Sequence, residues 1–161
     1  MIYHKTHLED YVESLLVDMN IRQPGQLNKF VISDKLGIYL HLYEGNSRGL
    51  TDDDNEKYIF LNRHLSRPER WQDFAHELCH ILRHDGDQKY MSFPFRQLQE
   101  WQSNNFMYNF CVPTFMLQRI RLPPDQHEAI RLIADTFNVD YQFAEKRLHK
   151  YYQKMYYSKI I

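Results

Sequence analysis

The chain has 161 residues, of which 43% are hydrophobic and 25% charged, a composition typical of a folded soluble domain and unlike disordered or collagen-like chains. Lys and Arg total 20 against 21 Asp and Glu, so the chain as a whole offers no electrostatic surface for nucleic acid or anionic lipid. No apolar leader or bilayer-length stretch is present in the sequence, which predicts no membrane contact. The two cysteines, Cys79 and Cys111, fit a reducing, cytoplasmic setting.

The first third of the chain predicts two helices followed by a small sheet. Residues 7–19 carry apolar side chains at helical spacing, and residues 26–36 form a weaker helical pattern that ends at Gly37. Three short strand candidates come next and are expected to form an antiparallel meander; they are residues 38–43, 48–51 and 57–61. The acidic run at residues 52–55 lacks the downstream carboxylate of a calcium loop, so we interpret it as a solvated turn.

The clearest predicted helix follows the strands. Ser66-Arg67-Pro68-Glu69 is a capping box with proline in the first turn, and Asp85-Gly86 is the expected stop. One side of this helix is an apolar stripe, while histidines and a glutamate lie on an adjacent face. Further helices are predicted around proline breaks, at residues 95–110, 126–137 and 140–152.

The chemistry of the chain is indicated by His76-Glu77-Leu78-Cys79-His80, which has the form His-Glu-x-x-His. Residues four apart on a helix share a face, about 6 Å apart along the axis, so His76 and His80 can converge on one cation while Glu77 reaches a metal-bound water. Zinc in such a site lowers the pKa of its water, and the carboxylate passes the proton to a leaving amine. The alternative to a metal site is that two exposed helix histidines have this spacing by chance.

A zinc site needs a third protein ligand, for which Glu100 is our candidate because it lies on a predicted helix twenty positions beyond His80. Asn104 follows one turn later on the same face, where its oxygen can accept the free ring N–H of a ligand histidine. His84 continues the histidine series as a rival ligand, but its place in the last turn favours a capping role, as an imidazolium at the helix dipole. Cys79 is expected to point away from the site as a packed thiol.

Four segments together resemble the ImmA/IrrE-type zinc metallopeptidases. They are Ile59-Phe60-Leu61-Asn62, Phe74 through His80, Glu100-x-x-Ser103-Asn104-x-Phe106 leading to Val112-Pro113, and Ile133 through Val139. They occur in order over most of the chain. Two positions depart from the family pattern, because Cys79 stands where the family usually has Gly and Ser103 where it usually has Ala.

The resemblance implies a compact zincin-like α+β metallopeptidase domain, with zinc held by His76, His80 and Glu100 and with Glu77 as general base. We therefore expect a small antiparallel three-stranded sheet in a mostly helical fold. Residues 1–161 are expected to form a single domain, with a zincin-like core at 1–124 and a helical segment at 125–161. The resemblance also implies an intracellular endopeptidase that cleaves a transcriptional repressor, often one of a prophage or integrative element.

An extended substrate is expected to bind at a sheet edge by strand addition, and residues 48–51 are the candidate edge. The group that stabilises the oxyanion is left open among many tyrosines, including Tyr90 and Tyr108.

The C-terminal helices leave a second class of function open. Residues 130–148 have the outline of a helix-turn-helix, followed by a locally basic, Tyr-rich end. These helices either contact DNA or pack on the core, and we favour packing because the chain has no basic excess. The second hypothesis is therefore a DNA- or protein-binding regulator with a structural or vestigial zinc site. The enzyme is favoured, because a structural site needs four closed ligands and does not need Glu77.

Overall fold

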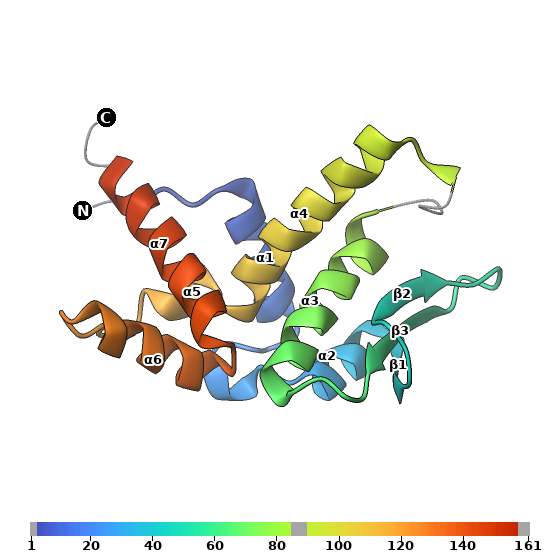
Figure 1. Ribbon diagram of the computed structural model, residues 1–161, viewed down its shortest axis with the longest axis horizontal. Helices are drawn as coiled ribbons and strands as arrows, with labels where there is room; N and C mark the ends of the chain where they lie inside the picture. The colour runs from blue at the N-terminus through green and yellow to red at the C-terminus, as the bar shows by residue number, and fades with distance from the viewer. Residues whose placement is uncertain (1–2, 85–89, 158–161) are drawn as a thin grey trace. The chain divides into compact units, whose positions relative to one another are not determined.

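The computed structural model describes residues 3–84 and 90–157, and the chain forms two compact units (Figure 1). One unit comprises residues 28–107, and the other combines residues up to 27 with those from 108 onward. This division does not coincide with the expected boundary at residue 124, because the N-terminal helix groups with the C-terminal helices. Within the described residues, no helix is both long enough and apolar enough to cross a membrane.

The unit of residues 28–107 contains a three-stranded sheet and three helices. Its elements are α2 (Lys29–Leu36), β1 (Ile38–Tyr43), β2 (Arg48–Thr51), β3 (Lys57–Asn62), α3 (Arg67–Arg83) and the part of α4 (Phe93–Cys111) up to residue 107. As predicted, α2 is followed by Gly37 in the left-handed conformation, with a φ of 65°. The acidic segment before β3 is a turn, in which the Asp52 carboxylate accepts the N–H groups of Asp54 and Glu56.

The prediction of an antiparallel meander is wrong for one strand pair. The strand order is β1-β3-β2, with β1 parallel to β3 and β2 antiparallel to β3. A parallel pair needs a connection that returns the chain to its starting end, and residues 44–56, which include β2, provide it. The spacing of the strands in the sequence suggested hairpins between successive strands. It did not indicate that the connection between β1 and β3 would make these two strands parallel. The sheet is therefore mixed, and β2 is an edge strand, as expected for residues 48–51.

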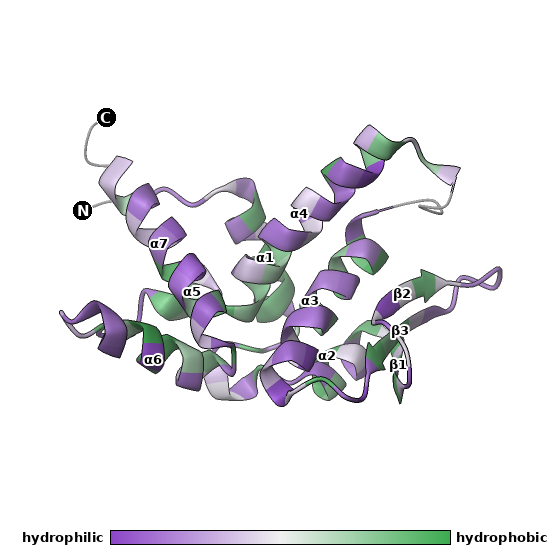
Figure 2. Cartoon of the chain, viewed as in Figure 1, coloured by the Kyte–Doolittle hydropathy of each residue, from purple (hydrophilic) through white to green (hydrophobic). Residues whose placement is uncertain are grey.

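Helix α3 lies against one face of this sheet. Ile59 and Leu61 of β3 are fully buried, as are Phe74 and Leu78 of α3. Gly49 permits a close approach, since a Cβ there would lie 3.1 Å from the Ile81 side chain and 3.2 Å from the backbone oxygen of Glu77. In Figure 2 the colour of α3 alternates between hydrophobic and hydrophilic along its turns. The apolar face is thus used for packing, which leaves the histidine face for α4.

The start of α3 forms as its sequence predicts. The Ser66 hydroxyl accepts the N–H of Glu69, and the Glu69 carboxylate accepts the N–H of Ser66 at 2.7 Å, which completes the capping box. His84 is the C-cap residue. The expected stop at Asp85-Gly86 lies outside the described residues.

The second unit is helical. It contains α1 (His7–Asp18), a short 3-10 helix (Pro24–Gln26), the end of α4, α5 (Thr114–Leu117), α6 (Gln126–Phe137) and α7 (Tyr141–Tyr157). α6 packs against α7 across a turn at Asn138, whose left-handed φ of 53° ends α6 where the sequence predicts a turn. α5 was not predicted, because four residues are too few to show a helical period.

A buried carboxylate, Glu9, joins the two ends of this unit. Glu9 is 6% exposed, and it accepts hydrogen bonds from Tyr3 at 2.5 Å, from the Thr6 N–H at 2.7 Å, from Thr114 at 2.6 Å and from Lys154. Burial by itself raises the pKa of Glu9, but these hydrogen bonds outweigh it and lower the pKa to about 2. The ionised form is therefore the one that stabilises the fold.

Replacing Glu9 by Gln should lower the free energy of unfolding by roughly 3 kcal/mol at pH 7, because the partners of the carboxylate stay buried without the charge. Because the pKa of Glu9 is lowered, its contribution is complete above about pH 4.5 and is lost as the pH falls towards about 2. The difference between wild type and Glu9→Gln, measured by urea denaturation, should shrink over that range. Glu13→Gln, which removes a partly exposed ion pair with Lys5, should change stability by less than about 1 kcal/mol. Equal losses in the two variants would contradict this interpretation.

Candidate metal centre

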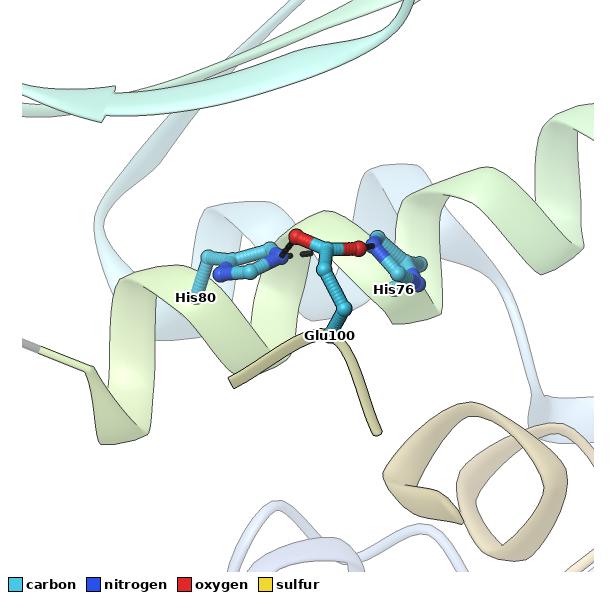
Figure 3. Close-up of side chains that lie close together, drawn as sticks. All are labelled: His76, His80 and Glu100. Carbon is cyan, nitrogen blue, oxygen red and sulfur yellow. Dashed lines mark hydrogen bonds and ion pairs between the residues drawn. The ribbon is translucent and has the colours of Figure 1, made fainter. Parts of the chain in front are cut away.

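Three side chains predicted as ligands converge between α3 and α4. His76 and His80 lie on adjacent turns of α3, and the Glu100 carboxylate of α4 lies between their rings (Figure 3). One carboxylate oxygen is 3.1 Å from Nε2 of His76, the other is 3.3 Å from Nε2 of His80, and the two nitrogens are 3.3 Å apart. All three residues belong to the unit of residues 28–107.

The spacing of these atoms fits a tetrahedral metal ion. Two ligand atoms about 2.1 Å from a zinc ion lie about 3.4 Å apart at the tetrahedral angle, close to the separations observed here. Within residues 3–84 and 90–157, this is the one cluster of three or more His, Cys, Asp or Glu side chains placed to hold a metal ion. Burial and the neighbouring His76 ring lower the pKa of His80 to about 4, so His80 is neutral near pH 7 and has a lone pair to offer.

Glu77 is largely buried beside the sheet edge and accepts a hydrogen bond of 2.8 Å from the backbone N–H of Gly49 in β2. Burial raises the pKa of the Glu77 carboxyl to about 7; the Gly49 hydrogen bond opposes this, while the charges of Asp73 and Glu100 add to it. A carboxyl group with a pKa near 7 can both accept and release a proton at neutral pH.

The contacts around His80 differ from those expected. Nδ1 of His80 is 3.0 Å from Nδ1 of His84, and Nε2 of His84 is 3.0 Å from the side-chain oxygen of Gln102. Asn104 is exposed and, among the described residues, makes no hydrogen bond to His76 or His80. It does line the same groove along α4 as Glu100. Burial lowers the pKa of His84, which favours a neutral ring and gives no support to the expected imidazolium at the helix end.

Cys79 and Ser103, the two departures from the family pattern, are neighbours. The Cys79 thiol is fully buried and forms a hydrogen bond with Ser103, and burial raises the pKa of the thiol to about 11. The Ser103 hydroxyl is also 3.2 Å from Nε2 of His80. Cys79 is therefore a neutral packed thiol, as expected, and the two small polar residues fill the crossing of α3 and α4 together.

An open groove of about 540 Å³ adjoins the ligand cluster along one face of α4. It is lined by Phe93, Arg96, Gln97, Glu100, Trp101 and Asn104. Phe93 and Trp101 are 63% and 65% exposed, so the groove presents apolar surface beside the carboxylate of the candidate cluster. Glu100 belongs to both the cluster and the groove.

Sequence reasoning named His84 and Ser103 but missed their contacts with His80, and it assigned no role to Gln102. The spacing of His84, four residues after His80, was a visible signal, since it places the two rings on one face. Gln102 and Gly49 carry no motif of their own, and the contacts of Gln102, Ser103 and Gly49 with α3 depend on tertiary packing. The oxyanion candidates differ in their surroundings: Tyr90 is 82% exposed, and Tyr108 stacks on Phe143 in the helical unit.

The family of the chain follows from comparison with known proteins. The family model described as "Peptidase_M78: IrrE N-terminal-like domain" matches residues 34–149, so the chain belongs to this metallopeptidase family, and the resemblance to ImmA/IrrE proteins is confirmed.

Two relatives come from Bacillus subtilis (strain 168). The "Phage-like element PBSX protein XkdA" is 43% identical over 143 residues, which are 89% of this chain and 72% of that protein. The "Uncharacterized protein YqaB" is 43% identical over 155 residues, which are 96% of this chain and 90% of that protein. Among solved structures, a "Mycobacterium tuberculosis transcriptional regulator" matches with a TM-score of 0.64 and 16% identity, covering 90% of this chain and 56% of that one. At this identity the structural match shows a shared fold.

Replacing Glu100 by Ala should weaken zinc binding by more than the roughly 10- to 100-fold that loss of an outer partner costs, because a direct ligand is removed. The measurement is a competition titration of the purified full chain against a zinc chelator. Glu44→Gln, which alters an exposed carboxylate, should leave the affinity unchanged. Wild-type affinity in Glu100→Ala would exclude Glu100 from the ligand set.

Proposed function

We propose that the chain is a zinc-dependent endopeptidase that hydrolyses a peptide bond in a protein substrate. The observation that carries this proposal is the open cluster of His76, His80 and Glu100, with the Glu77 carboxyl on the same helix as both histidines. Three protein ligands leave a coordination position for water or substrate, as in catalytic zinc sites. A structural site would close that position with a fourth ligand.

Zinc in such a site supplies Lewis acidity, which activates water and polarises a peptide carbonyl. Glu77 takes the proton of the attacking water and later delivers it to the leaving amine. Its pKa of about 7 suits both transfers at neutral pH. The Gly49 N–H holds the Glu77 carboxyl at the sheet edge.

Replacing Glu77 by Gln should leave the fold and zinc affinity intact, because the amide is isosteric and keeps an oxygen for the Gly49 N–H. Cleavage should fall by at least about 100-fold, because the proton acceptor is lost. The assay incubates the zinc-loaded chain with a purified candidate repressor and identifies products by mass spectrometry. Glu56→Gln, an exposed carboxylate in the turn before β3, is the control. Unchanged cleavage by Glu77→Gln would refute the general-base assignment.

The substrate is proposed to be a transcriptional repressor, cleaved in the cytoplasm. Membership of the Peptidase_M78 family and the relative in the PBSX phage-like element support this substrate class. An extended substrate segment would pair with the edge of β2 that faces away from β3. The groove along α4 would receive an apolar side chain next to the cleaved bond, because Phe93 and Trp101 flank Glu100 there.

Replacing Trp101 by Ala should raise KM for cleavage by roughly 10-fold, because a bound apolar side chain loses a large contact surface. The turnover number should change less, since Trp101 is neither a proposed metal ligand nor a proposed proton-transfer group. Phe95→Ala is the matched control: Phe95 is an exposed aromatic of the same helix, 49% exposed, that does not line the groove. Equal effects of the two substitutions would argue against the groove as a substrate site.

The alternative function, a DNA-binding regulator, is less well supported. Three basic residues of α7 are used within the helical unit: Arg147 is 3% exposed, Lys150 lies over the Tyr108 ring, and Lys154 pairs with Glu9. These side chains are therefore not aligned as a phosphate-binding surface. A titration of the chain with labelled duplex DNA should show no salt-sensitive binding.

A further inference from the structure

His84 and Gln102 form a short hydrogen-bonded chain that ends on a proposed metal ligand. The Gln102 oxygen is 3.0 Å from Nε2 of His84, and Nδ1 of His84 is 3.0 Å from Nδ1 of His80. The far nitrogen of His80, Nε2, is the atom that faces Glu100 and His76. All of these residues lie in the unit of residues 28–107.

The chemical identities of these atoms determine which atom donates and which accepts in each of the two hydrogen bonds. The amide oxygen of Gln102 only accepts, so Nε2 of His84 carries a proton and donates it. A neutral imidazole has one N–H, so Nδ1 of His84 is left with a lone pair and accepts from Nδ1 of His80. His80 is then protonated at Nδ1, and its Nε2 lone pair points towards the cluster. The Ser103 hydroxyl near the same Nε2 can donate or accept and does not change this order.

We propose that His84, held by Gln102, is a positioning residue that fixes the tautomer of His80, so that the Nε2 lone pair of His80 is directed to a bound metal ion. This inference rests on the metal site of the proposed function. It differs from the capping role expected for His84, because that role needs an imidazolium, whose two ring nitrogens both donate, whereas here Nδ1 of His84 accepts a hydrogen bond. It also differs from a role as rival ligand, because both ring nitrogens of His84 already have partners, Nδ1 of His80 and the Gln102 oxygen, and neither faces the point where the ligand atoms meet.

Zinc affinity of the full chain, measured by competition with a chelator, gives the first test. His84→Ala should bind zinc at least about 10-fold more weakly than wild type, as is typical when the outer partner of a ligand histidine is lost. His84→Asn should recover most of this loss, because the Asn side-chain oxygen can take the place of Nδ1 and accept from His80. His84→Gln should not recover it, because its amide reaches the position of Nε2 instead. His64→Ala, at an exposed histidine, is the control.

The second test reads the tautomer directly in the metal-free chain, by nitrogen NMR of the histidine rings. In wild type and His84→Asn, His80 should carry its proton on Nδ1; in His84→Ala, the Nε2-protonated form should appear. If His84→Ala fails to fold by circular dichroism, Gln102→Ala replaces it, since Gln102 is exposed and its loss frees the His84 ring.

The outcomes separate this inference from the proposed function. Tight zinc binding by wild type with equal affinity in His84→Ala, or an unchanged His80 tautomer, would overturn the positioning role and leave the peptidase proposal standing. Failure of wild type to bind zinc would overturn both.

Discussion

The candidate centre depends on the contact of one carboxylate with two rings across a helix crossing. Glu100 of α4 lies within 3.3 Å of His76 and His80 of α3, so any relative slip of these helices breaks the cluster. The apolar face of α3 is fixed on the sheet by fully buried side chains such as Phe74 and Leu78. The close approach at Gly49 brings β2 to the same helix. The sheet thus holds α3 in place, and α4 completes the site.

Features set by interactions between residues close in sequence could be predicted, whereas features set by residues far apart in sequence were harder to predict. The helix of the His-Glu-x-x-His motif was predictable, because its cap, its period and its stripe are local patterns. Glu100 was predictable as a ligand candidate from its place on a second helix, and the structure brings it to both histidines. The parallel pairing of β1 with β3 was not predictable, because it joins strands separated by a third.

The surroundings of the ligands were harder to predict than the ligands themselves. Asn104 was expected beside a ligand histidine because it follows Glu100 by one turn, but that spacing continues the exposed face of α4. Gln102 reaches His84 instead, since His84 lies at the end of α3. The contact of Cys79 with Ser103 likewise joins two positions that are far apart in sequence and were noted separately as departures from the family pattern. Each of these partners is set by how α3 and α4 cross.

The backbone N–H of Gly49 can serve two hydrogen-bond acceptors, but only one at a time. The Gly49 N–H of the edge strand donates to Glu77, and an edge strand offers such groups to an added strand. A peptide that pairs with β2 at Gly49 therefore competes with the resting carboxylate for the same hydrogen. Under the proposed function, a substrate bound at this position would release the Glu77 carboxyl from the Gly49 N–H as the bond to be cleaved arrives, and the proposed general base would then be free to move.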